Sequence, residues 1–206
     1  MNKPRKPIAP SSWRRKDWFF RATKAFGNLF LLRLFRLETK GLENLPHDSA
    51  FVLLPKHQRW EDIPLLSLAT PRPLYYVAKH ELFATFISNW FLRSLGGIPL
   101  NRKRPLESRR SLQAIIEYLK EGEGMVVFPE GTYYRNRMGP GHPGIVRLIL
   151  SRLRLPFIPV GMSYANQKGR VLVRICFGEP SYGDSSVRAN EFFAHIMARI
   201  ATLSGL

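Results

Sequence analysis

His57 and Asp62 stand close together in the segment KHQRWED at 56–62, with four residues between them. The segment follows an apolar run at 50–54 and precedes a helical pattern, and α/β sheets usually expose working side chains in loops after strands. In such a loop Asp62 can hold one ring nitrogen of His57, which leaves the other nitrogen free to take a proton from a hydroxyl group. The spacing alone is not specific, because His and Asp fall this close together by chance in many chains.

Three further segments carry residue types that suit a ligand site. In FPEGT at 128–132, glycine permits close approach to the backbone and Glu and Thr supply polar groups, although a Pro/Gly turn with a helix cap is the alternative. In GGIPLNRKR at 96–104, a short strand runs into three cations that suit a phosphate monoester, with a solvated basic loop as the alternative. LPFIPV at 155–160 is an apolar strand entry that simple core packing also explains.

Taken together and in this order, the four segments resemble the 1-acylglycerol-3-phosphate acyltransferase family, within the glycerolipid acyltransferases. That family has a His-x4-Asp box, a Gly-rich segment ending in Arg, a Phe-Pro-Glu-Gly-Thr box and a Pro-containing apolar strand. The segments GLENLP at 41–46 and KHELF at 79–83 also look like family phrases. The resemblance covers most of the chain, from about 37 to 180.

The resemblance implies transfer of a fatty acyl group from an acyl carrier protein or acyl-CoA thioester to the free hydroxyl of lysophosphatidic acid, giving phosphatidic acid for phospholipid biosynthesis. His57 is then the general base and Asp62 orients it, with no covalent acyl-enzyme and no metal or cofactor beyond the thioester co-substrate. By the same analogy Arg102 holds the acceptor phosphate, and the strand at 156–160 helps to shape the acyl site. The residues implied to position the glycerol and phosphate portion are Glu130, Gly131 and Thr132.

The sequence departs from the family pattern at three places. Lys56 stands where the family usually has Asn, which adds a cation beside the base and is expected to lower its proton affinity. Tyr133 replaces the customary Arg, a phosphate contact for which Arg135 or Arg137 is a candidate substitute. The segment GPGHPG at 139–144 makes this loop stiff and Gly-rich. These changes leave open the same chemistry on another lysolipid acceptor.

Short apolar runs alternate with helical patterns along the chain, which predicts an α/β domain with a central mixed sheet flanked by helices. The expected strands lie at 50–54, 74–78, 98–100, 125–128, 157–162 and 171–177. Helices are expected at 62–69, 81–95, 144–152 and 187–201, and between Pro105 and Gly122. We therefore expect a flexible basic lead-in at 1–12, a membrane-anchoring helical segment at 13–37 and an acyltransferase domain at 38–206.

The segment 13–37 is aromatic, aliphatic and basic together, with helical spacing. A break or sharp bend near 27–32 would reconcile its two arcs of cations, so we expect an amphipathic helix or helical hairpin in a membrane interface. An amphipathic helix packed on the protein's own core is the alternative. No transmembrane helix or signal peptide is expected, which favours a peripheral or monotopic protein on the cytoplasmic face of a membrane, as at a bacterial inner membrane.

The formal charge of +17 implies a surface that attracts polyanions, either phospholipid headgroups or nucleic acid. A non-enzymatic basic binding protein is therefore the alternative from another class, but no nucleic-acid fold signature appears and no nucleic-acid partner is expected. A serine hydrolase is disfavoured, because the segment around Ser163 lacks the closing glycine of a nucleophile elbow. A metal enzyme is disfavoured too, since the five histidines are scattered without ligand spacing.

Overall fold

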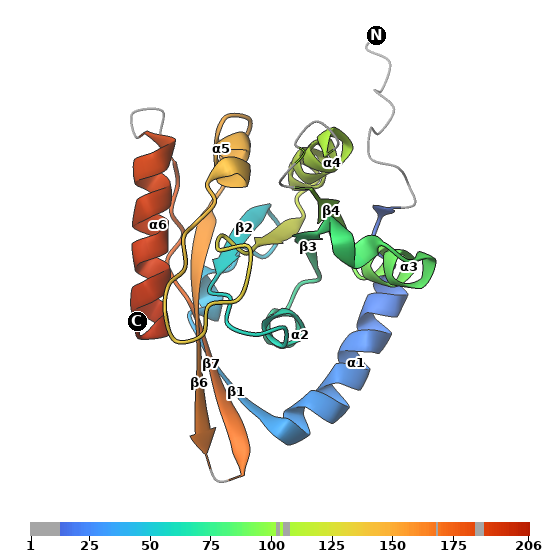
Figure 1. The fold of residues 1–206 in the computed structure, drawn as a ribbon, viewed down its shortest axis with the longest axis vertical. Helices are drawn as coiled ribbons and strands as arrows, with labels where there is room; N and C mark the ends of the chain where they lie inside the picture. Colours follow the sequence, from blue (N-terminus) through green and yellow to red (C-terminus); the bar gives the residue numbers. More distant parts are fainter. Residues whose placement is uncertain (1–12, 102–103, 105–107, 168, 184–187) are drawn as a thin grey trace.

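The protein is described by a computed structural model that covers residues 13–101, 104, 108–167, 169–183 and 188–206. Its centre is one seven-stranded sheet with the order β1-β7-β6-β2-β5-β3-β4 (Figure 1). The strands are β1 Phe35–Lys40, β2 Phe51–Pro55, β3 Leu74–Lys79, β4 Gly97–Leu100, β5 Gly124–Val127, β6 Phe157–Gln167 and β7 Arg170–Phe177. The predicted α/β class with a sheet flanked by helices is confirmed.

The sheet is mixed, as predicted. Strands β2 to β6 all run in one direction, and β6 turns back into β7 as an antiparallel pair. Strand β1 then pairs parallel to β7, so both run against the other five strands. The carboxyl ends of the five parallel strands therefore lie at one edge of the sheet, which we call the carboxyl edge.

Helices cover both faces of the sheet and create two cores. Because successive strand residues point to opposite faces, Val52 and Leu54 of β2 enter one core and Phe51 and Leu53 the other. The first core packs against α4 Arg109–Lys120, α5 Gly144–Leu150 and α6 Ala189–Ser204. The second packs mainly against α2 Asp62–Ala69, and Leu31 of the first helix reaches it. Cover on both faces explains why β2 and β5 are buried along their full length.

Six strands lie where the sequence predicted them, and β1 is the strand that the prediction missed. The residues FRLETK were placed at the end of the helical segment or just after it, yet apolar and charged side chains alternate there with the period of a strand. The predicted helix at 81–95 divides at Thr85 into the short helix η3 His80–Phe83 and α3 Phe86–Ser94. Another short helix, η2 Leu42–Asn44, follows β1.

The first helix, α1 Asp17–Leu34, runs without interruption, so of the two predicted alternatives the single helix is found, and a break near 27–32 and the helical hairpin are wrong. Gly27 lies within it at the crossing with α2, where an added methyl group would touch Leu68. Of its residues only Phe20 is fully buried, and no helix in the described chain is long and apolar enough to cross a bilayer. The predicted lead-in at 1–12 and Arg102 lie outside the described residues.

Candidate active site

Two adjacent strands bring the His57 and Glu130 segments together. Strand β2 ends at Pro55, just before His57, and β5 ends at Val127, just before the FPEGT turn. Because these strands pair in parallel, both loops leave the sheet at the carboxyl edge, where ligand sites of α/β sheets occur. The backbone N–H of Tyr134 donates to the carbonyl of His57 at 2.9 Å, which joins the two loops directly.

Asp62 holds His57 as the sequence predicted. Its Oδ2 atom lies 2.9 Å from Nδ1 of the imidazole and also accepts the backbone N–H groups of Gln58 at 2.6 Å and Arg59 at 2.8 Å. The hydroxyl of Tyr164 donates to the other oxygen, Oδ1. Asp62 is fully buried in the first turn of α2, where the helix dipole favours a negative charge. These donors fix the carboxylate, so it can orient the ring.

The imidazole of His57 is also fixed by two aromatic rings. The ring of Phe128 stacks on it with centroids 3.9 Å apart, and Tyr133 meets it edge-on at 4.4 Å. The residue is 7% exposed, and its Nε2 atom has no hydrogen-bond partner among the described residues. A hydroxyl group that reached Nε2 would meet an acceptor whose orientation is already set, as general-base catalysis requires.

Lys56 and Glu130 form a buried ion pair behind the histidine. The Lys56 ammonium lies 2.8 and 3.0 Å from the two carboxylate oxygens and also donates to the carbonyls of His57 and Tyr134. The carboxylate of Glu130 accepts in addition the backbone N–H groups of His57 at 3.0 Å and Gly139 at 2.6 Å. Both side chains have no exposed surface. The pair therefore ties together the His57 loop, the FPEGT turn and the loop that follows it.

This pairing changes the interpretation of both residues. Lys56 was expected to act as a cation beside the base, but its charge is matched by Glu130 and its ammonium bonds the backbone of His57 rather than the ring. Glu130 was expected to contact the acceptor, but its carboxylate is enclosed and already accepts four hydrogen bonds. The geometry makes Glu130 a positioning residue for the loop that carries His57.

The other predicted binding residues lie at the surface of the turn. Gly131 adopts a positive φ of 69°, which a side chain would strain, and Thr132 beside it is exposed. Arg135 and Arg137, the candidate substitutes for a phosphate contact, are exposed in the same loop. The strand at 156–160 is buried between β2 and β7, so its predicted place in the acyl site would be indirect.

Two polar residues of the site were missed in the sequence. Gln58 donates from Nε2 to the carbonyl of Met162 at 2.6 Å and accepts the N–H of Asn136, which adopts a left-handed conformation. Tyr164 belongs to the segment around Ser163 that was considered, and disfavoured, as a nucleophile elbow. Ser163 lies inside β6 rather than at a turn. The alternation of β6, which sends Met162 and Tyr164 to one face and Ser163 to the other, was the available signal.

Replacing Tyr164 with phenylalanine should lower kcat. Burial and the neighbouring Asp62 raise the pKa of Tyr164, so its hydroxyl stays protonated and donates to the carboxylate. Without this donor the carboxylate is held less firmly, so it orients His57 less well. We expect kcat to fall by about tenfold, as for loss of one hydrogen bond to a charged group, while KM changes little because the ring that stacks under Arg59 is kept. An unchanged kcat would contradict this.

A cavity of about 720 Å³ is lined in part by Phe128, whose ring stacks on His57. Its apolar lining comes from the ends of β4 and β5 and from helices α4 and α5. The lining includes Leu100, Leu112, Val127, Phe128, Ile145 and Leu148. His142 and Arg147 add polar atoms, and the size falls within the range typical of small-molecule sites. The residues that the structure describes contain no group of three His, Cys, Asp or Glu side chains fit to hold a metal ion.

Comparison with known sequences places these motifs in a family. The sequence model of the family described as Acyltransferase matches residues 36–163. The chloroplastic 1-acyl-sn-glycerol-3-phosphate acyltransferase BAT2 of Brassica napus is 28% identical over 189 residues, which are 84% of this chain and 53% of that protein. The 1-acyl-sn-glycerol-3-phosphate acyltransferase of Bacillus subtilis is 40% identical over 91 residues, 44% of this chain and 45% of that protein. The chain thus spans about half the length of these relatives.

The fold has a solved counterpart as well. The crystal structure of the 1-acyl-sn-glycerophosphate (LPA) acyltransferase PlsC from Thermotoga maritima superposes with a TM-score of 0.70 at 25% identity, covering 93% of this chain and 82% of that one. The family match includes the whole His57–Asp62 segment and the FPEGT turn, which the structure brings together at the carboxyl edge. The family predicted from the four sequence segments is confirmed, and the chain belongs to the acyltransferase family.

Proposed function

We propose that this protein transfers a fatty acyl group from an acyl-CoA or acyl carrier protein thioester to the free hydroxyl of lysophosphatidic acid, giving phosphatidic acid. One observation carries the proposal: His57 is held by Asp62 and two aromatic rings, and its Nε2 atom is unpartnered among the described residues. The names of the relatives and of the structural counterpart support the choice of acceptor. The protein acts, on this proposal, in phospholipid biosynthesis.

The chemistry follows from the position of the free ring nitrogen. Nε2 of His57 removes the proton from the acceptor hydroxyl as its oxygen attacks the thioester carbonyl, and the imidazolium formed is stabilised by Asp62. The tetrahedral intermediate then collapses, an ester bond forms, and the carbon–sulfur bond breaks. The leaving thiolate takes the proton back from the imidazolium, so no acyl-enzyme is needed. The protein's own part is orientation of reactants and transfer of one proton.

The acceptor phosphate requires cations near the turn. On this proposal Gly131 and Thr132 line the glycerol portion, and Arg102 holds the phosphate, as the family resemblance implies. Arg135 and Arg137 are exposed on the loop after Thr132 and would supply the contact that Tyr133 lacks. A second acceptor, another lysolipid without a simple phosphate monoester, is favoured by one observation: Tyr133 packs on His57 where the family usually has a phosphate-binding Arg.

The acyl chain needs an apolar space beside the reacting carbonyl. The 720 Å³ cavity meets this need, because Phe128 lines it and also stacks on His57. We therefore place the acyl chain of the donor in this cavity, with the thioester directed toward Nε2. The buried strand at 156–160 then acts at a distance, by supporting β2.

We also propose that the protein lies on the cytoplasmic face of a membrane as a peripheral or monotopic protein, as at a bacterial inner membrane. Phospholipids are then its surface partners, and α1 supplies the contact. Helix α1 exposes Trp18, Phe26, Leu29, Phe30 and Leu34 by 47–68% of their surface, although packing on the protein's core would have hidden such residues. Exposed aromatic residues beside cations suit a membrane interface.

The decisive experiment is acyl transfer by the purified protein, with both donor classes, to a panel of lysolipids in anionic vesicles. We expect transfer to lysophosphatidic acid to exceed transfer to any other lysolipid by at least about tenfold, because a positioned phosphate contact contributes roughly 1.5–3 kcal/mol. Product is identified by mass, and heat-inactivated protein is the control. Transfer to another lysolipid instead would move the acceptor but keep the chemistry, whereas no transfer from either donor would overturn the proposal.

A further inference from the structure

A second apolar surface, contributed by an element other than α1, lies at the start of α3. Phe86 is 85% exposed and Ile87 is 77% exposed, and Leu82 in the preceding η3 is 52% exposed. We call these three residues the α3 patch. Soluble domains rarely display neighbouring large apolar side chains to this extent unless the surface binds something. No proposed step of the reaction uses them.

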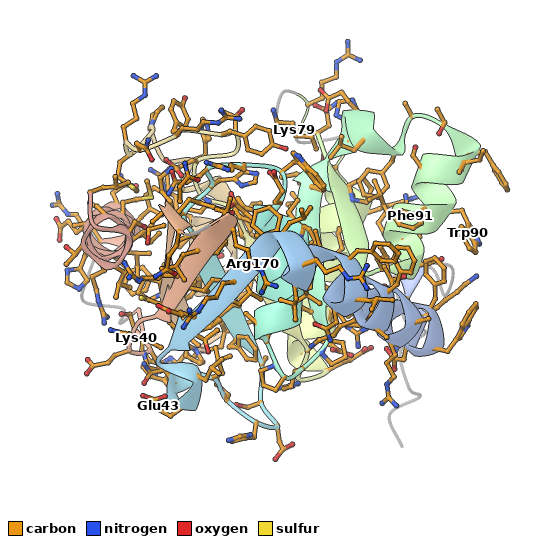
Figure 2. All side chains as sticks on the ribbon, turned by 90° about the horizontal axis from the view of Figure 1, so that it is seen from below. Lys40, Glu43, Lys79, Trp90, Phe91 and Arg170 are labelled. Carbon is orange, nitrogen blue, oxygen red and sulfur yellow. The ribbon has the colours of Figure 1, made fainter. Side chains whose placement is uncertain are left out.

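The exposure of the α3 patch is built into the fold rather than a result of fraying. Thr85 and Ser88 form a capping box, in which each side chain accepts the backbone N–H of the other residue. One turn further along the same face of the helix, Trp90 and Phe91 contact Phe19 of α1 with ring centroids 5.2 and 5.8 Å apart, although both remain partly exposed. In Figure 2 both side chains point from α3 toward α1. The cap at the start of α3 and the packing of its second turn on α1 therefore fix the direction in which the patch points.

The topology places the α3 patch at the same edge of the sheet as His57. Strand β3 ends at Lys79 at the carboxyl edge, and η3 and the first turn of α3 follow at once. Helix α1 begins near the far end of α3, where Lys16 donates its N–H to Ser94, and ends where β1 begins beyond the carboxyl edge. The C-terminal half of α1 and the α3 patch thus both lie on the side of the sheet at which the catalytic pair opens.

The charge around the patch indicates what covers it. Lys79 is exposed directly before η3, as Figure 2 shows from this side, and the Lys16 ammonium lies 5.0 Å from the Trp90 ring centre. A second copy of the chain would bring another +17 charge to this surface, whereas an anionic bilayer supplies the opposite charge and an apolar layer. Protruding apolar side chains beside cations are the composition of membrane-binding surfaces.

We infer that the α3 patch is a second membrane-inserting element, which together with α1 sets the carboxyl edge of the sheet against an anionic lipid surface. The inference rests on the proposed membrane function and goes beyond it, because α1 alone could attach the protein in many orientations. Because α1 and the α3 patch both bind lipid on the same side of the sheet, the protein is held with His57 facing the bilayer that contains the acceptor.

The test compares sedimentation with anionic vesicles for three matched variants of the full chain. Phe86→Gln with Ile87→Gln removes the patch, Phe26→Gln with Phe30→Gln removes the α1 contact, and Tyr182→Gln removes an exposed aromatic residue near the start of β6, at the opposite edge. We expect each double variant to bind roughly tenfold or more weakly and the Tyr182 variant to bind like wild type. Activity with detergent-dispersed acceptor should be unchanged in the α3 variant, which shows that it is folded.

The outcomes separate this inference from the proposal on which it rests. If the α1 variant leaves the vesicles but the α3 variant binds like wild type, the α3 patch is not a lipid contact. If wild type is a dimer that the α3 variant dissociates without losing vesicle binding, the patch is a subunit contact and the inference is overturned. If wild type itself ignores vesicles, the proposed membrane function fails together with the inference, although transfer to dispersed acceptor can still hold.

Discussion

Replacing His57 with alanine should lower kcat for acyl transfer by about a thousandfold, within the range expected for loss of a general base. The effect is large because, among the described residues, the neighbouring carboxylates cannot replace the base: Asp62 is fully buried and Glu130 is enclosed by donors. KM for the acceptor should change little, since the predicted acceptor contacts lie on the FPEGT turn and its following loop. Single-turnover transfer from a radiolabelled thioester measures the chemical step directly.

The variant to compare with His57→Ala is Asp62→Asn, which keeps the ring but alters the group that orients it. Asn keeps the size of the side chain but replaces one carboxylate oxygen with an NH2 group, which is a donor. If this group takes the place of Oδ2, the backbone N–H groups of Gln58 and Arg59 lose their acceptor. We expect kcat to fall substantially but to remain above that of His57→Ala, because the ring itself is still present. Activity of His57→Ala within tenfold of wild type, in folded protein, would contradict the assigned mechanism.

Breaking the buried ion pair should cost both stability and activity. Lys56→Met leaves the Glu130 carboxylate enclosed without its counter-ion, and loss of one partner of a buried pair typically costs about 3–5 kcal/mol. Glu130→Gln should have a similar effect, because it leaves the ammonium enclosed. Urea unfolding followed by circular dichroism measures the free energy of unfolding. We expect kcat to fall too, since the pair bonds both the N–H and the carbonyl of His57.

The double variant Lys56→Met with Glu130→Gln makes this prediction specific. Replacing a buried ion pair by neutral groups of similar volume is often close to neutral, so the double variant should recover most of the stability lost in either single variant. The amide oxygen introduced by Glu130→Gln can still accept the N–H of His57, so part of the activity should return with it. If the loss of stability in the double variant equals the sum of the losses in the two single variants, the residues act independently. That result would contradict the positioning assigned to the pair.

The contact between His57 and Asp62 could be predicted from the sequence because its geometry is local. His57 and Asp62 lie in one loop between a strand and a helix, and the family resemblance supplied the roles that spacing alone could not. The Lys56–Glu130 pair and the Tyr164–Asp62 hydrogen bond join residues 74 and 102 positions apart. Such contacts depend on strand order, which hydrophobic periodicity does not determine.

The parts of the fold that could be predicted from the sequence were likewise those set by local sequence patterns. Apolar runs such as the one at 50–54 predicted six strands at their correct places, and the most continuous of them are parallel strands covered on both faces. Strand β1 was missed because its partner, β7, lies more than a hundred residues away and its own pattern is half charged. Gly27 of α1 lies against Leu68 of α2, a contact between distant segments that helical spacing does not report.

The order of the strands also determines when the site can exist. Strand β5 lies between β2 and β3, and β6 flanks β2 on its other side, although both follow β3 in the chain. During synthesis the His57 loop therefore emerges long before the partners that enclose it, and Asp62 acquires its Tyr164 donor only when β6 has been added. Since long-range pairing is slow, we expect a nascent chain to pass through a state in which β3 and β4 can pair while β2 and the His57 loop still lack their partners.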